Sequence, residues 1–151
     1  MMNCESKKRV PIVTIKLVRE KSILYAKRRI TSPGDAVSLF RDYMGDLDRE
    51  HFVLMGLNMK NEPVVLETVH IGSLSASIVH PREVFKSAIL SNAACIMVCH
   101  NHPSDDCEPS GEDVSVTERL AQAGDLIGIP LLDHLIIGTE GYVSLKERGH
   151  C

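Results

Sequence analysis

The feature that most constrains this chain is an apolar segment that leads directly into two histidines. Residues 93–99 form a continuous apolar run of strand length, which is typical of a strand covered on both faces. His100 and His102 follow it, and because side chains alternate along an extended segment, the two imidazoles point to the same side. Two imidazoles on one side of a strand can bind one metal ion.

A carboxylate is expected near these histidines, at the start of the next helix. Ser110 is a residue type that N-caps helices, and Asp113 then lies in the positive first turn, which favours a carboxylate. Apolar residues recur at helical spacing from Asp113 onward, so its side chain begins the inward stripe. Two histidines and one aspartate match a catalytic zinc site, which keeps an open position for water, and we expect Zn²⁺ as the cofactor.

Each half of this pattern also has a plain structural explanation. A His-x-His pair alone is a weak signal, and Ser-x-x-Asp before an apolar stripe is most often a variant of the capping box. Their joint occurrence at the end of a buried strand favours the metal site. Zinc activates water and polarises a carbonyl, so we expect amide hydrolysis, with a carboxylate outside the metal shell as proton acceptor.

Helical and extended patterns alternate along the rest of the chain. Strands are predicted at 10–18, 50–58, 64–69, 93–99, 131–137 and 142–145, and helices at about 34–44, from Pro81 to about Ser91, and from Ser110 to between Gly124 and Gly128. This alternation predicts an α/β fold in which helices pack on the faces of a mixed sheet. Residues 1–30 are interpreted as an N-terminal arm and edge strand, and 31–151 as a single domain.

Composition argues against several kinds of partner. The formal net charge of −3 disfavours direct nucleic-acid binding, because such binding depends on clustered Lys and Arg. Five scattered cysteines without a preceding signal segment predict a reduced, cytoplasmic chain rather than a secreted disulfide framework. No apolar run approaches the ~18 residues that a membrane span needs, so no membrane association is expected.

The pattern His-x-His-Pro…Ser-x-x-Asp resembles the signature of the JAMM (MPN+) metalloproteases. Residues 79–86, 100–104 and 131–138 look like the RadC family (UPF0758) in particular, and the match covers about residues 31–147. The resemblance implies a cytidine-deaminase-like JAB/MPN fold, with a mixed β-sheet flanked by helices on both faces. It also implies a short form, because no N-terminal helix-hairpin-helix region fits ahead of Ser32, as in mobile-element or prophage copies.

The resemblance assigns a role to each candidate site residue. The expected zinc ligands are His100, His102 and Asp113, and Ser110 is expected to hold the water or the tetrahedral oxyanion. The family places its catalytic Glu at the head of an early strand, in a Glu-x-x-x-x-Gly-Leu-like context, which Glu50 matches. Glu67 is the alternative, but it lacks that context.

The loop between His102 and Ser110, and the later strand at 131–137, contain residues with more than one interpretation. Asp105 stands where the family usually has Gly, and Cys107 is interpreted as a possible zinc ligand or oxidation site beside the open position. His134 is adjacent to Asp133, which suggests an acid/base pair. Because adjacent strand residues face opposite sides, a structural histidine is the favoured interpretation.

The sequence is consistent with two functions of different class. The first is a zinc-dependent metallopeptidase or isopeptidase acting on a peptide or protein substrate, with Glu50 accepting the proton of the water. The second is a non-catalytic RadC-like interaction module associated with DNA repair or mobile-element functions. The presence of all five expected site residues favours the enzyme.

Overall fold

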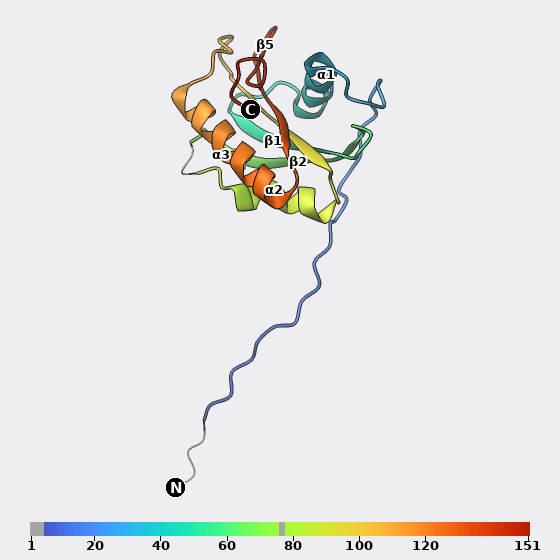
Figure 1. The fold of residues 1–151 in the computed structure, drawn as a ribbon, viewed down its shortest axis with the longest axis vertical. Helices are drawn as coiled ribbons and strands as arrows, with labels where there is room; N and C mark the ends of the chain where they lie inside the picture. Colours follow the sequence, from blue (N-terminus) through green and yellow to red (C-terminus); the bar gives the residue numbers. More distant parts are fainter. Residues whose placement is uncertain (1–4, 76–77) are drawn as a thin grey trace.

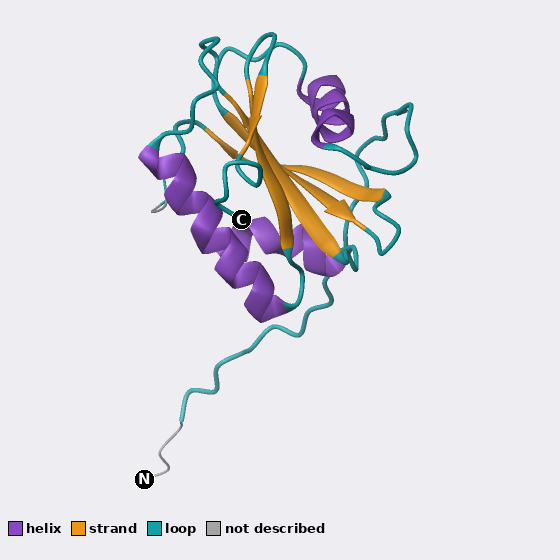
Figure 2. Cartoon of the chain, turned by 45° about the horizontal axis from the view of Figure 1, so that its top comes forward, coloured by secondary structure: helices purple, strands orange, loops and turns teal. Residues whose placement is uncertain are grey.

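The computed structural model describes residues 5–75 and 78–151, which form one mixed sheet with helices on both faces (Figures 1 and 2). The elements are α1 Pro33–Met44, β1 His51–Leu57, β2 Pro63–Ile71, α2 Pro81–Leu90, β3 Cys95–Asn101, α3 Gly111–Ile127, β4 Leu131–Ile137 and β5 Tyr142–Ser144. The strand order is β2-β1-β3-β4-β5, and β3 and β4 are parallel whereas the other neighbours are antiparallel. The predicted α/β fold is confirmed.

The central strand β3 separates two apolar cores. Cys95, Met97 and Cys99 contribute to the core beneath α1. Ile96 and Val98 contribute to the core beneath α2 and α3. Because side chains alternate along a strand, a residue two positions beyond Val98 also faces α3. The end of β3 therefore presents its next side chain to the start of that helix.

Local sequence signals explain where the helices begin and end. Ser32 caps α1, where its hydroxyl oxygen accepts a hydrogen bond from the Asp35 backbone nitrogen at 3.3 Å. Pro81 opens α2 at a position where the missing N–H costs little. Gly128 follows α3 in the left-handed conformation (φ 85°), which glycine adopts without steric penalty.

The prediction of a strand at residues 10–18 is wrong. This segment is extended but pairs with no strand of the described sheet, and it runs away from the domain (Figure 1). Its apolar side chains are exposed, among them Ile12 and Val18. The β-branched residues supply strand propensity, but a strand also needs a neighbour for its backbone hydrogen bonds and a core for its apolar face. Among the described residues the chain first packs on the core at Ile23 and Ile30.

The other predicted elements are confirmed close to their expected bounds. The difference that matters for the site is in β3, which continues past residue 99 to Asn101, so that His100 is part of the strand. None of the helices in the described parts of the chain has the length and apolar character that crossing a membrane requires.

Candidate metal centre

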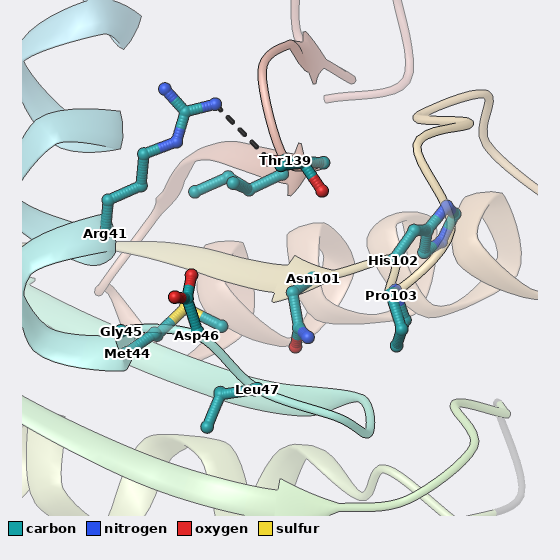
Figure 3. Close-up of a pocket in the computed structure, with 11 residues that line it drawn as sticks. Arg41, Met44, Gly45, Asp46, Leu47, Asn101, His102, Pro103 and Thr139 are labelled. Atoms are coloured by element: carbon teal, nitrogen blue, oxygen red, sulfur yellow. Dashed lines mark hydrogen bonds between the residues drawn. The ribbon is translucent and has the colours of Figure 1, made fainter.

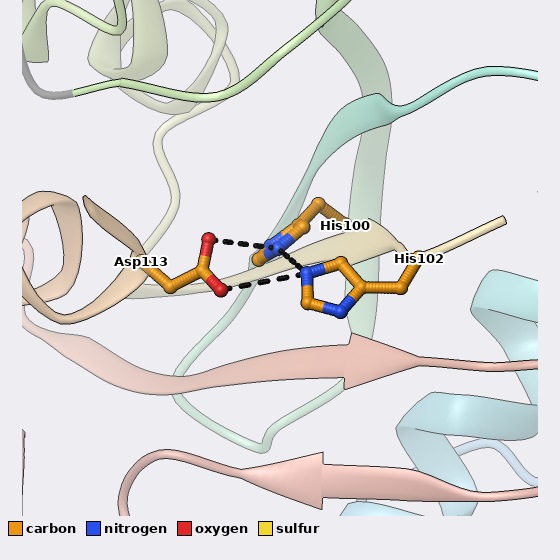
Figure 4. Close-up of side chains that lie close together, drawn as sticks. All are labelled: His100, His102 and Asp113. Atoms are coloured by element: carbon orange, nitrogen blue, oxygen red, sulfur yellow. Dashed lines mark hydrogen bonds and ion pairs between the residues drawn. The ribbon is translucent and has the colours of Figure 1, made fainter. Parts of the chain in front are cut away.

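Three side chains converge at the end of β3 (Figure 4). His100 Nε2 lies 3.1 Å from Asp113 Oδ1, and His102 Nε2 lies 3.4 Å from Asp113 Oδ2. The two Nε2 atoms are 3.0 Å apart. One ligand atom from each residue lies within 4.8 Å of the other two, so the predicted set comes together. Two imidazole nitrogens and a carboxylate oxygen are a donor set that suits Zn²⁺.

Different elements hold these three residues. His100 is the sixth residue of β3 and is almost fully buried on the face toward α3. His102 follows the strand, and its backbone N–H donates to the Ile137 carbonyl oxygen at the end of β4. Asp113 is in the first turn of α3 and is 2% exposed. The site therefore consists of two buried residues, His100 and Asp113, and one partly exposed histidine, His102.

The start of α3 is a complete capping box. Ser110 Oγ accepts from the Asp113 backbone nitrogen at 3.1 Å, and Asp113 Oδ2 accepts from the Ser110 backbone nitrogen at 2.8 Å. Burial alone would raise the pKa of the Asp113 carboxyl, but the hydrogen bond and charge of His100, together with the Ser110 hydrogen bonds, hold that pKa well below its usual range. The carboxylate is thus ionised and available to a cation.

The loop after β3 orients His102. His102 Nδ1 lies 2.8 Å from the backbone oxygen of Asp106. A carbonyl oxygen can only accept, so Nδ1 carries a proton and donates it, which leaves Nε2 as the nitrogen that can bind a metal ion. Backbone carbonyls commonly orient metal-binding histidines in this way.

His134 supports the other histidine, a role that the sequence did not indicate. His134 is fully buried, and its Nε2 lies 2.8 Å from His100 Nδ1 while its Nδ1 lies 2.6 Å from Thr117 Oγ1. Burial, and then the charge of His100, holds the pKa of His134 well below its usual range. Thr117 follows Asp113 by one helical turn, and this spacing is the one sequence signal that could have identified Thr117 as a neighbour of the site.

Asp133 does not form an acid/base pair with the His134 ring. Its carboxylate accepts from Ser144 Oγ at 2.7 Å and from the backbone nitrogens of His134 and Lys146. Burial raises the pKa of this carboxyl, against the hydrogen bond from Ser144. The favoured interpretation of His134 as a structural residue holds, although its ring contacts a candidate ligand.

Glu50 lies beside the candidate ligands, immediately before β1. Its Oε2 accepts a hydrogen bond from the Leu74 backbone nitrogen at 3.1 Å. It lines a cavity of about 280 Å³, whose other walls include His102, Ser110 and Asp113. The alternative carboxylate, Glu67, is on β2 opposite Leu54 and is not among the residues that line this cavity.

A second cavity of about 390 Å³ adjoins the first and shares His102 and Pro103 with it. Arg41 and His102 lie at opposite ends of it in Figure 3. Arg41 donates to the backbone oxygens of Gly138 and Gly141 at 3.4 and 3.1 Å, which holds α1 against the β4–β5 turn. An extended ligand bound in this cavity would pass beside the partly exposed His102.

Cys107 lies in the same loop but outside the ligand cluster. Its Sγ donates to the Gly141 backbone oxygen at 3.4 Å, and burial raises the pKa of the thiol. The group of side chains that could hold an ion, within the described residues, is made without it. The possible role of Cys107 as a zinc ligand is therefore not supported. The Asp105 backbone oxygen packs beside Gly138, where an added Cβ would be 3.3 Å away.

Comparisons with known proteins identify the family of this chain. A family model described as a RadC-like JAB domain matches residues 30–150. A UPF0758 protein of Rubrobacter xylanophilus is 49% identical over 147 residues, which cover 96% of this chain and 64% of that protein. A UPF0758 protein of Shouchella clausii is 56% identical over 120 residues, or 80% of this chain and 52% of that protein. This chain thus spans between half and two thirds of the length of these relatives, and it belongs to the RadC (UPF0758) family through its JAB domain.

Proposed function

We propose that this chain is a zinc-dependent hydrolase of peptide or isopeptide bonds. The observation that carries the proposal is that His102 and Asp113, two members of the three-residue cluster, line one cavity together with a separate carboxylate, Glu50. Catalytic zinc sites typically have three protein ligands, whereas structural sites have four. A JAB domain alone would not indicate catalysis, because function depends on the site rather than on the fold.

The residues of the cavity have separate roles in the proposed reaction. When bound, zinc would lower the pKa of a water molecule to about 7 and polarise the scissile carbonyl. Glu50 accepts the proton of the attacking water and passes it to the leaving amine. The Leu74 N–H bond to Oε2 orients that carboxylate. Ser110 donates its hydroxyl hydrogen to the substrate oxygen as charge develops there, while its oxygen continues to cap α3.

A peptide or protein is the proposed substrate. The larger cavity extends from Arg41 to His102, and Gly138 and Thr139 of the β4–β5 turn form part of its wall, so an extended chain bound along it would reach the candidate metal site. The net charge of −3 continues to disfavour nucleic acid as a direct ligand.

The test compares two carboxylate variants. Zinc content is measured for the wild type, Glu50→Gln and Glu67→Gln, and each zinc-loaded protein is incubated with a peptide and isopeptide library. We expect one zinc per chain in all three, cleavage by the wild type and Glu67→Gln, and none by Glu50→Gln. Equal cleavage by the wild type and Glu50→Gln would overturn the role of Glu50, and no cleavage by any of them would overturn the hydrolase.

A non-catalytic interaction module, of the kind associated with DNA repair or mobile elements, is the alternative. The exposed β-branched segment at residues 10–18 favours it, because such a segment can add a strand to a partner's sheet. This alternative predicts a zinc-loaded chain that cleaves nothing in the library and binds a partner only while residues 10–18 are present.

A further inference from the structure

The two candidate histidine ligands are supported in different ways. His102 Nδ1 faces the Asp106 carbonyl oxygen, which accepts under all conditions. His100 Nδ1 faces another imidazole nitrogen, His134 Nε2, at 2.8 Å. An imidazole nitrogen can accept or donate, depending on the tautomer. The direction of the hydrogen bond to His100 must therefore be decided farther from the metal site.

Thr117 decides that direction. Its hydroxyl lies 2.7 Å from the Asp113 backbone oxygen and must donate there, because a carbonyl oxygen only accepts. The hydroxyl has a single hydrogen, so toward His134 Nδ1, at 2.6 Å, its oxygen can only accept. Burial favours a neutral His134 ring, which then carries its single proton on Nδ1 and accepts at Nε2. His100 in turn must donate from Nδ1.

We propose that Thr117 and His134 form a hydrogen-bond relay that sets the tautomer of His100 and keeps its Nε2 lone pair directed at the metal. Both are positioning residues, because they act on the metal only through His100. The inference rests on the metal site of the proposed function but not on hydrolysis. It assigns the hydrogen-bond direction His100 → His134 → Thr117, each arrow pointing from the donor to the acceptor.

Burial makes this relay strict. Thr117 and His134 are 0% exposed and His100 is 1% exposed, so solvent does not compete for their hydrogen bonds. The ring of Phe52 lies parallel to His100 and edge-on to His134, with centroid distances of 6.4 and 5.6 Å. An imidazole packed in this way cannot easily rotate to find another partner, and an unpaired buried donor costs about 1–3 kcal/mol.

The helix α3 supplies both ends of the arrangement. Asp113 contributes a ligand oxygen from its side chain, and its backbone oxygen accepts from Thr117 one turn later. This bond from Thr to the carbonyl four residues earlier is common in helices. Here it also orients the hydroxyl. Asp113 and Thr117 are therefore held in a fixed relative position by a single turn of helix.

The first experiment observes the tautomers in the intact chain. Nitrogen-15 NMR of the histidine rings distinguishes a protonated from an unprotonated nitrogen, and it is recorded for the wild type with and without Zn²⁺. We expect His134 to be protonated at Nδ1 and unprotonated at Nε2 in both states, and His100 to be protonated at Nδ1. A His134 proton on Nε2 would overturn the relay. This measurement does not depend on any variant.

The second experiment removes the acceptor at Thr117. In Thr117→Val, His134 loses its partner at Nδ1 and can move its proton to Nε2, which drives the His100 proton onto the ligand nitrogen. We expect Zn²⁺ affinity, measured by chelator competition, to fall about 10–100-fold, as for other changes to residues that orient ligands. Thr117→Ser keeps the hydroxyl and should bind zinc as the wild type does.

Ser144→Ala is the matched control. It removes another buried hydroxyl beside β4, one that donates to Asp133 and has no part in the relay. Circular dichroism and thermal unfolding report the fold of every variant. We expect Ser144→Ala to lower stability and leave zinc affinity unchanged. Wild-type zinc affinity in folded Thr117→Val, or an equal loss in Ser144→Ala, would overturn the inference.

The outcomes separate this inference from the proposed hydrolase. Zinc binding with the expected tautomers but without cleavage of any substrate would support the relay and contradict the hydrolase. Cleavage that survives in Thr117→Val at saturating zinc, with weakened affinity, would support both. A wild-type chain that binds no zinc would overturn the relay's role and the hydrolase together.

Discussion

Asn101 accepts a hydrogen bond from the backbone nitrogen of His51 at 2.7 Å, through its side-chain oxygen. Its side-chain nitrogen donates to the Arg49 backbone oxygen at 3.0 Å. The two bonds enclose Glu50, the residue between these partners. Asn101 also follows His100 directly on β3, so one side chain links the proposed base to the strand that presents a ligand.

Asn101→Ala should impair turnover without affecting zinc. Loss of both bonds frees the backbone on either side of Glu50, and a displacement of about 1 Å can lower a rate by ~10²-fold. The measurement is kcat on a cleaved peptide together with zinc affinity. Asn58→Ala is the control, because the Asn58 amide likewise accepts from backbone nitrogens, in the β1–β2 turn. Equal loss of kcat in both variants would contradict a specific role for Asn101.

Two substitutions of Ser110 should separate its structural and catalytic parts. Ser110→Ala removes the cap and should lower the free energy of unfolding by about 1 kcal/mol, whereas Ser110→Gly should cost only a few tenths. Both remove the hydroxyl, so both should lose activity to a similar extent. Urea unfolding and peptide cleavage check the two effects. Activity that follows stability, with Ser110→Gly nearly wild type, would show that the hydroxyl serves only as a cap.

Gly138→Ala should disturb the loop that holds His102. A Cβ at this position would lie 2.6 Å from Cys107 Sγ, which is too close for ordinary contact. Relief of such overpacking costs roughly 1–3 kcal/mol, and moving Cys107 also shifts the neighbouring Asp106 carbonyl from His102 Nδ1. We expect lower stability and weaker zinc binding.

The double variant Gly138→Ala/Cys107→Ala tests the cause. It removes the sulfur that the new methyl group meets, so zinc affinity and stability should recover most of the loss. Thermal unfolding and chelator competition measure both quantities. A double variant as impaired as Gly138→Ala would place the cause elsewhere in the loop.

The start of α1 should make stability depend on pH in the acid range. The hydrogen bond from the Thr31 side chain, followed by that from its backbone nitrogen, lowers the pKa of Asp35 from 3.8 to about 2. A lowered carboxyl pKa contributes stability above the unfolded value, and this contribution is lost as pH falls from about 4 to about 2.

Thr31→Val should raise the pKa of Asp35 toward 3.8, since it removes the first of these bonds. NMR titration of the Asp35 carboxyl measures the shift directly, and urea unfolding across the same pH range should show a weaker pH dependence than in the wild type. An unchanged Asp35 titration in the folded variant would contradict this account of α1.

The clustering of the three candidate ligands could be predicted because its information is local. His100 and His102 are two residues apart along an extended segment, and Asp113 follows a helix cap within the same short stretch, so the spacing alone brings them together. Glu50 came from the family resemblance rather than from geometry. Its place in the cavity depends on the pairing of β1 with β3, and its role and that of Ser110 stay predictions.

The residues that support the candidate ligands could not be predicted, because their contacts depend on strand pairing rather than on local sequence. His134 reaches His100 only because β3 and β4 are parallel neighbours in this register, which no local pattern in the sequence shows. The alternation of side chains directs Asn101 away from the candidate ligands, but it gives no indication of its bonds to Arg49 and His51. Residues 10–18 are the converse case, because strand propensity there is strong while the sheet offers no partner.

The connection from β3 through α3 to β4 would affect the rate at which a bound ion is released. Asp113 and Thr117 are both carried by the first turns of α3, so fraying of that helix end removes a ligand and the relay's hydroxyl in one event. Ion release would then be limited by cooperative local opening, which is measured by amide hydrogen exchange, rather than by rotation of one side chain. Residence time at the site would become a property of the helix.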